Sequence, residues 1–509
     1  MPTHTASIST ATRSSKSPWI AQTPAGPLLG PVLAAGLSTV VAMWVAWFLT
    51  HMPATIRWFP PGITGPLLLS IMLVVMTMGL SRVPSRRGVL VGLLAGVLVG
   101  AVNLLVLGSK ITQPIQADGM ASAAPGAEGL RPDAGMIVLG FLGLCAVVGV
   151  IAGLVGGRLS AARKTLAEGA GVWHARVAAV SCIAVIPLLA LGGMVTSTGS
   201  GLAVPDWPGT YGANMFLFPI SLMAGDARIF LEHSHRLFGA MVGVCCVLLA
   251  ISTFASHRGR SARGLRLFSL VLLALVILQG LLGAERVRSG IAQGVEVGPQ
   301  SWGVAHGVLA QIFFALLVAF AALCWPRYET FGAGAASLAK PRGHGFVNKA
   351  SVALVVAIFI QLVMGALYRH LGQMHALFAH VVFSLVVVGL AVACAMWMLR
   401  RKGEARIYKT LGHGLLHSVG FQFLMGWVAL LLVMTGAGKP AIVLPDELQA
   451  AEAITTEVAV KALVRTIHQA NGAVLLALAV LAVVWPRRIG AQTASEAAEP
   501  ADPALARPA

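Results

Sequence analysis

Four histidines lie close to the start of four different apolar segments of this chain. They are His235, His306, His380 and His468. A histidine inside hydrocarbon is costly, so a repeated placement of this kind indicates a shared function. Imidazoles that project inward from the helices of a membrane bundle can hold haem iron from both sides. The pattern therefore predicts that all four are axial ligands of haem iron.

The sequence EHSHR at 232–236 is the densest cluster of reactive side chains. Glu232 and His235 are three residues apart and share a helix face. Beside a haem edge, Glu232 could relay protons or hold a polar substrate group, which makes it the candidate catalytic residue. Arg236 at the membrane interface could bind a haem propionate through charge-assisted hydrogen bonds. The alternative is an interfacial cluster in which Glu232 and Arg236 only pair with one another. His233 points away from His235 on a helix and is expected to be solvated.

The second half of the chain leaves one ligand open. His375 precedes His380 by five residues, but alignment of HRLFGAMVG with HVVFSLVVVG favours His380. Arg369 and His370 are expected in a short outer loop. The counterpart of Arg236 in the second half is Val381. Arg369 could therefore bind a haem propionate at the second site, as Arg236 could at the first.

A second pair of histidines and a long loop rich in glycine and aromatic residues also stand out. His413 and His417 are four residues apart, but they fall at the opposite end of their apolar segment and are expected to be interfacial. The segment STGSGLAVPDWPGTYGANMFLFP, stiffened by Pro205 and Pro208, is expected to be a lid over the first site. A plain structured loop is the alternative.

The composition requires a membrane to surround these residues. Apolar residues make up 57% of the 509 and charged residues 11%, and the mean hydropathy is +0.83. A soluble fold does not hide that much apolar surface, so the sequence predicts an all-α polytopic membrane protein. About twelve segments are long enough to span a bilayer. They are 30–50, 63–80, 88–108, 136–156, 176–196, 235–255, 266–284, 302–324, 349–368, 377–399, 411–435 and 466–486.

The charges predict the orientation of these spans. Basic loops such as SRVPSRRG, GRLSAARK and LRRKGEAR alternate with acidic or neutral ones. Basic loops remain in the cytoplasm, so both termini are expected inside and the four histidines toward the outer face of the plasma (inner) membrane. The net charge of +18 is then a topology signal, and nucleic acid is not expected as a partner.

The chain divides near residue 170. The expected parts are a cytoplasmic polar tail (1–29), a four-span extension of unknown role (30–170), two four-helix bundles (171–325 and 326–488) and a disordered cytoplasmic tail (489–509). His235 and His380 lie 145 residues apart and His306 and His468 lie 162 apart, which indicates that the bundles are pseudosymmetric copies. All six cysteines fall within expected spans and are taken as small buried hydrophobes.

At these residues the chain resembles the haem A synthase family. The resemblance is carried by GGMVTSTGSGLAVPDWP, by EHSHR and by the helix openings at His306, His380 and His468, and it covers roughly residues 172–488. It implies eight transmembrane helices in two pseudosymmetric four-helix bundles. The four extra spans at the N-terminus are outside this core, and no outer loop carries the cysteine pair found in some bacterial members.

The resemblance also implies the chemistry. The family oxidises the C8 methyl of haem O to a formyl group by successive hydroxylations and uses a haem B as prosthetic group. By the family pattern, His235 and His306 bracket the substrate haem O, Glu232 is needed for turnover, and His380 and His468 bracket the haem B. The implied partners are membrane lipid, an external electron donor and a haem O synthase.

Two other functions fit the same histidines. A membrane b-type cytochrome that passes electrons to quinone would need all four but not Glu232. A non-catalytic assembly or haem-handling factor is the third hypothesis. A transporter is disfavoured, because the polar residues gather at the outer edge rather than at mid-membrane.

Overall fold

The computed structural model describes most of the chain as long helices. The described residues are 28–53, 57–114, 128–162, 170–257, 259–292, 297–325, 344–400, 406–435, 454 and 456–498. Twelve long helices lie in this part: α1 (Leu29–Thr50), α2 (Thr64–Leu80), α3 (Ser85–Leu107), α4 (Ala134–Ala162), α5 (Ala170–Ser197), α7 (Ala227–Ser256), α8 (Arg263–Ala292), α9 (Val297–Cys324), α10 (His344–Leu371), α11 (Met374–Leu399), α12 (Arg406–Met434) and α13 (Thr456–Ala498).

The remaining elements are short and lie in the connections. They are the helix α6 (Ile220–Gly225), three 3-10 turns (Pro61–Ile63, Gly108–Lys110 and Arg260–Ala262), the antiparallel pair β1 (Thr112–Pro114) and β2 (Glu128–Leu130), and the antiparallel pair β3 (Gly209–Thr210) and β4 (Ala213–Asn214).

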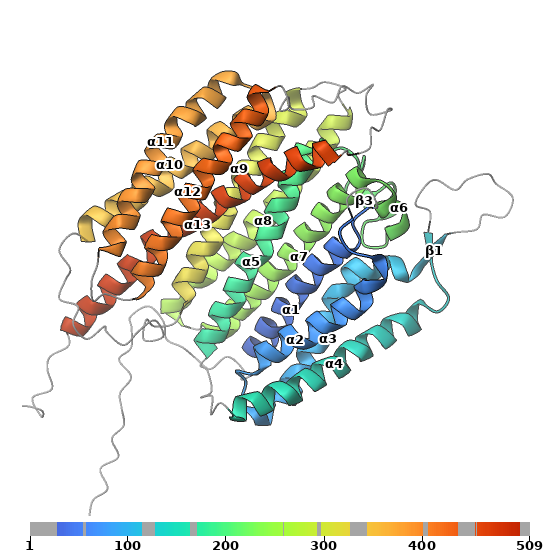
Figure 1. The fold of residues 1–509 in the computed structure, drawn as a ribbon. Coiled ribbons are helices and arrows are strands. Elements are labelled where there is room, and N and C mark those ends of the chain that lie inside the picture. Colours follow the sequence, from blue (N-terminus) through green and yellow to red (C-terminus); the bar gives the residue numbers. More distant parts are fainter. Residues whose placement is uncertain are drawn as a thin grey trace, which may run out of the picture.

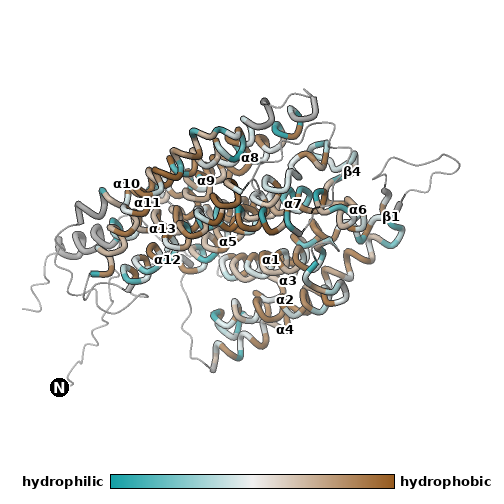
Figure 2. The backbone as a smooth tube through the Cα atoms, turned by 45° about the horizontal axis from the view of Figure 1, so that its top comes forward, coloured by the Kyte–Doolittle hydropathy of each residue, from teal (hydrophilic) through white to brown (hydrophobic). Residues whose placement is uncertain are grey.

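Eleven of the described helices are long and apolar enough to cross a membrane. The twelfth, α2, is apolar but has 17 residues, fewer than the roughly 20 of a typical crossing. The prediction of an all-α polytopic membrane protein is therefore confirmed. Apolar residues run along the helix bodies, while hydrophilic ones gather at helix ends and around α6 and β4 (Figure 2).

The long helices associate in fours. In each group the contacts close a ring: α1, α2, α4 and α3; then α5, α7, α8 and α9; then α10, α11, α12 and α13. We call the first group the N-terminal unit and the other two the first and second bundles. The first bundle lies between the other groups, with α1 packed on α5 and α7, and with α9 and α5 packed on α10 and α13 (Figure 1).

The N-terminal unit is held together by glycine contacts and one buried hydrogen bond. α3 and α4 approach so closely that a Cβ on Gly92 or Gly149 would overlap the backbone of the other helix. Small residues permit this approach in membrane helices. Between α1 and α3, the Trp44 indole donates to Oδ1 of Asn103 at 2.9 Å, with both side chains buried.

The two ends of the chain are described to different extents. The tail 489–509 is not disordered throughout, because α13 continues to Ala498. Its Ala- and Glu-containing sequence favours helix and explains the extension past the membrane span. The tail 1–29 lies almost wholly outside the described residues, as do residues 436–453.

All six cysteines lie in long helices and are free, and all but the half-buried Cys182 are buried. Their expected place as small apolar residues within spans is confirmed.

Candidate functional site

The four histidines meet in two pairs. His235 on α7 faces His306 on α9, with ring centroids 6.3 Å apart and planes at 78°. His380 on α11 faces His468 on α13, with centroids 6.2 Å apart and planes at 72°. Each pair lies within one bundle, so the two bundles repeat the same arrangement.

This separation suits a metal ion between the rings. Two imidazole nitrogens bound on opposite sides of one ion, each at about 2 Å, lie about 4 Å apart, and each ring centroid lies about 1 Å farther out. The expected centroid separation is thus about 6 Å, close to both observed values. The rings are also half-buried rather than packed over, which leaves them accessible to a planar group.

Each of the four rings lies against a glycine of a neighbouring helix in its own bundle. A methyl group on that glycine would lie 3.1–3.4 Å from Cε1 of the histidine. The four pairs are Gly192 with His235, Gly283 with His306, Gly365 with His380, and Gly426 with His468. The absent side chain gives each imidazole its position, so we call these residues the glycine seats.

A glutamine lies four residues before three of the glycine seats and contacts the same histidine. Gln361 donates from Nε2 to the backbone carbonyl of His380 at 2.7 Å, and Nδ1 of His380 lies 2.9 Å from the Gln361 carbonyl oxygen. A carbonyl only accepts, so Nδ1 carries the proton and Nε2 is left free to bind a metal. Gln279 donates to the His306 carbonyl, and Gln422 contacts the His468 ring.

The sequence analysis identified neither the glycine seats nor the glutamines. The available signal was the repeated spacing Gln-x-x-x-Gly, in which the glutamine and the glycine both face the following histidine helix. α5 lacks this spacing, because the residue four positions before Gly192 is Leu188 rather than a glutamine.

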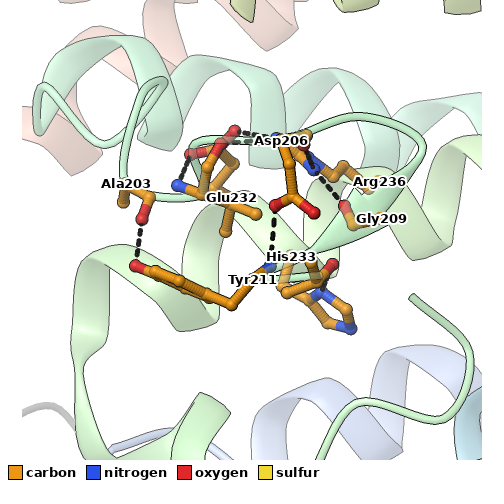
Figure 3. A network of polar contacts seen from close by, with 9 residues as sticks. Ala203, Asp206, Gly209, Tyr211, Glu232, His233 and Arg236 are labelled. Carbon is orange, nitrogen blue, oxygen red and sulfur yellow. Dashed lines mark hydrogen bonds and ion pairs between the residues drawn. The ribbon is translucent and has the colours of Figure 1, made fainter. Parts of the chain in front are cut away.

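Glu232 and Arg236 pair with each other and also hold residues 198–219, the segment after α5 for which we keep the name outer loop from the sequence-based expectation (Figure 3). Arg236 Nη2 lies 2.7 Å from Glu232 Oε1, and the Val204 N–H donates to Glu232 Oε2 at 2.8 Å. The guanidinium also donates to the carbonyls of Val204, Asp206 and Gly209 at 2.6–3.0 Å. The sequence analysis gave the pairing of Glu232 with Arg236 as an alternative, and the structure contains this ion pair.

The outer loop is itself tightly folded. The Asp206 carboxylate accepts the backbone N–H groups of Tyr211 at 2.7 Å and Gly212 at 2.9 Å, and the Tyr211 hydroxyl donates to the Ala203 carbonyl (Figure 3). Tyr211 (φ 51°) and Gly212 (φ 79°) turn the chain between β3 and β4 in the left-handed region. The loop thus lies on α7 within one turn of His235, next to the first pair.

His233 is not solvated as expected. Its side chain is 1% exposed, and its Nδ1 lies 3.2 Å from the Thr210 hydroxyl. The Phe218 ring lies 5.3 Å from the imidazole. The helical spacing correctly separated it from His235, but the outer loop folds back over that face and buries it.

Arg286 on α8 is a further cation at the first pair that sequence reasoning missed. Its guanidinium lies against Gly201 of the outer loop, where a methyl group would come within 2.8 Å of Nη2. It is an electrostatic neighbour of Glu232. The sequence feature that could have indicated Arg286 is a basic residue in the GAERVR segment, near the end of a predicted span.

Arg369 and His370 do not lie in a loop. α10 continues through both to Leu371, since nothing in MGALYRHL stops a helix before Gly372 (φ 65°). Arg369 donates to Gln469 Oε1, to the Gly193 carbonyl and to the Ser197 hydroxyl, each at 2.6 Å. It therefore joins α10 to α5 and α13 at the interface between the bundles, one residue from His468.

The remaining histidine candidates lie away from both pairs. His375 is exposed in the first turn of α11. His413 and His417 are exposed near the start of α12, with stacked rings 6.2 Å apart. Within the described residues no group of three or more His, Cys, Asp or Glu side chains is arranged to hold a bare metal ion.

Comparison with known proteins finds a family that resembles the middle part of the chain. Residues 175–380 match the model of COX15-CtaA, described as a cytochrome oxidase assembly protein. This segment is similar to members of that family. The COX15-CtaA match includes the first histidine pair, Glu232 and Arg236, and ends at His380.

Curated relatives of the chain carry the name Heme A synthase. One from Beijerinckia indica is 32% identical, over 36% of this chain and 55% of its own length. One from Bradyrhizobium diazoefficiens is 32% identical, over 37% and 55%. One from Alkalihalophilus pseudofirmus is 30% identical, over 28% and 44%. The chain thus spans about half the length of the curated relatives it matches. No solved structure matches it.

Proposed function

We propose that this protein is a haem A synthase, an oxidoreductase acting on CH or CH2 groups that converts the C8 methyl of haem O to a formyl group by successive hydroxylations. The observation that supports this proposal best is the presence of two histidine pairs of similar geometry. Among the described residues, only the first pair adjoins a buried carboxylate. The relatives named Heme A synthase support the same conclusion.

The two pairs have different roles in this proposal. His380 and His468 hold a haem B, which supplies a redox centre within the second bundle. His235 and His306 hold the substrate haem O. Glu232 carries or receives protons beside the substrate, and its contact with the Val204 N–H fixes the direction of its carboxylate.

The arginines near the first pair complete the substrate site. The Arg286 guanidinium lies against Gly201 of the outer loop and interacts electrostatically with Glu232, and it is placed to bind a propionate. Arg236 keeps the outer loop closed, which excludes water from the first pair. For Arg236 to contact a propionate directly, as expected from the sequence, its guanidinium must release one of the backbone carbonyls that it now binds.

The cellular setting follows from the charge pattern. The protein is placed in the plasma membrane with both termini in the cytoplasm and both histidine pairs toward the outer face. An external reductant supplies electrons, and a haem O synthase supplies the substrate.

A membrane b-type cytochrome is the second candidate, and one observation favours it. Both oxygens of Glu232 are already bonded, one to Arg236 and one to the Val204 N–H. A carboxylate with these contacts could serve only to hold the outer loop.

The test is expression of the full chain with a source of haem O, followed by pyridine-haemochrome analysis. A synthase yields haem A, and Glu232→Gln abolishes conversion while both haems remain bound. Glu457→Gln is the matched control, because Glu457 is 74% exposed on α13. Haem B in both sites with no conversion would establish the cytochrome, and conversion by Glu232→Gln would remove Glu232 from the mechanism.

A further inference from the structure

The N-terminal unit lies outside the COX15-CtaA match, yet it contacts the parts of the first bundle that carry the reactive residues. α1 packs against α7. The Phe48 ring stacks on Phe230 with centroids 5.1 Å apart, and Trp44 meets Phe238 edge-on at 5.7 Å. Phe230 and Phe238 are 0% and 1% exposed, and they lie two residues before and two residues after the EHSHR motif. α1 therefore packs against α7 at residues on either side of the motif.

The end of α3 contacts the outer loop. A Cβ on Gly108 would overlap the carbonyl oxygen of Phe216 and lie 3.0 Å from Cδ2 of Leu217. The Thr112 hydroxyl contacts the Leu217 carbonyl at 3.4 Å. The backbone of Gly108 is helical, with φ −54° and ψ −37°. Glycine is thus required here by the approach of the loop and not by the conformation of its own backbone.

These two contacts belong to one body. Trp44, which meets α7, donates its indole N–H to Asn103 of α3, whose amide lies 3.4 Å from the Met43 sulfur. All three side chains are buried. A polar pair inside an apolar helix group is costly to separate, so α1 and α3 move together.

The loop transmits the contact to the reactive residues. The Phe216 N–H donates to Oδ1 of Asn214 at 2.9 Å, and Asn214 pairs with Gly209 in the β3–β4 hairpin. The Gly209 carbonyl then accepts from Arg236 at 3.0 Å. A continuous series of contacts thus runs from Gly108 to the ion pair of Glu232.

We infer that the N-terminal unit is a positioning element for the first histidine pair: it holds α7 and the outer loop together, and so fixes Glu232 and Arg236 beside the substrate. The catalytic part of this inference rests on the proposed function. Among the larger helix contacts, the unit touches α5 and α7 of the first bundle, so the second pair serves as an internal reference.

The test uses the full chain, loaded with haem, in three matched comparisons. Gly108→Ala introduces a methyl against the Phe216 carbonyl, and Gly140→Ala is its control, because nothing lies within 4 Å of that position on α4. Phe48→Ala removes the aromatic contact with α7, and Leu139→Ala, at a side chain 71% exposed, is its control. Phe48→Leu is the milder variant should Phe48→Ala fail to accumulate.

Three measurements distinguish positioning from general damage. Hydrogen exchange of peptides covering the outer loop should be roughly tenfold faster in Gly108→Ala and Phe48→Ala than in their controls, because local opening becomes easier. The midpoint potential of the first haem should shift while that of the second stays unchanged. With haem O, kcat should fall more than KM rises, because a misplaced Glu232 weakens the transition state rather than binding.

Equal loop exchange in variants and controls would overturn the inference, and so would equal shifts at both haems, which indicate a general loss of structure. The exchange and potential measurements do not need turnover. A protein that shows both effects but makes no haem A overturns the proposed function and leaves the positioning role intact.

Discussion

Nδ1 of His380 lies 2.9 Å from the backbone carbonyl of Gln361, nineteen residues earlier on the neighbouring helix. This contact fixes which nitrogen carries the proton and turns Nε2 toward His468. The orientation of a candidate iron ligand is therefore set by the backbone of α10 before any haem is bound. The adjoining glycine seat, Gly365, allows the two helices to come close enough for the contact.

Gly365→Val should weaken haem binding at the second pair. The added methyl groups would lie within about 3 Å of the His380 ring and displace it, and loss of such supporting contacts typically costs about 10–100-fold in metal affinity. Haem content per protein, measured by pyridine haemochrome, should fall from two toward one. Gly389→Val on α11, where nothing lies within 4 Å, should retain both haems. Equal haem content in the two variants would show that the glycine seat is dispensable.

His380→Ala should remove the second haem, and His375→Ala should not. Only His380 faces His468, whereas His375 is exposed at the start of α11. The optical spectrum of each purified variant is the measurement. Loss of a haem from His375→Ala with retention in His380→Ala would reverse the assignment.

Arg236→Gln should release the outer loop and destabilise the protein. It leaves the carboxylate of Glu232 buried without its partner, and such a change costs about 3–5 kcal/mol. Limited proteolysis in the 198–219 region and thermal unfolding report the two effects. Arg86→Gln is a useful control, because that arginine is exposed near the start of α3, at the opposite end of the helix from its contact with the outer loop. Unchanged proteolysis of Arg236→Gln would mean that the loop is held by other contacts.

His257, at the end of α7, should make stability sensitive to acid. Burial lowers the pKa of this imidazole in the folded protein, and neither ring nitrogen has a hydrogen-bond partner among the described residues. The unfolded chain therefore binds the proton more readily, so stability is lost as pH falls below about 6.5, the ordinary histidine pKa. His257→Phe should flatten this part of the curve of unfolding temperature against pH. A variant with the same acid slope as the wild type would assign the effect to other groups.

The sequence predicted the helices well, because long apolar runs have few alternatives in a membrane. It also selected the four histidines that meet in pairs, since a repeated cost inside hydrocarbon needs a common cause. The ligation of iron by these histidines stays a prediction, as does the role of Glu232.

What sequence reasoning missed depends on contacts between distant segments. The burial of His233 depends on a loop that folds back over α7, and no periodicity within α7 encodes that cover. The glycine seats are ordinary glycines until a histidine from another helix lies against them. Arg369 was placed in a loop because the end of α10 carries charges, but those charges find polar partners on α5 and α13.

The placement of the first bundle limits the routes by which a lipid-dissolved molecule could reach it. α1 covers the seam of α5 and α7, and α10 and α13 cover the flank formed by α5 and α9. α8 is the least covered of the four helices and faces the bilayer along most of its length. Among the described helices, the α8 side of the first bundle is therefore the side least covered by the rest of the chain, and a porphyrin dissolved in the membrane would meet the bundle there.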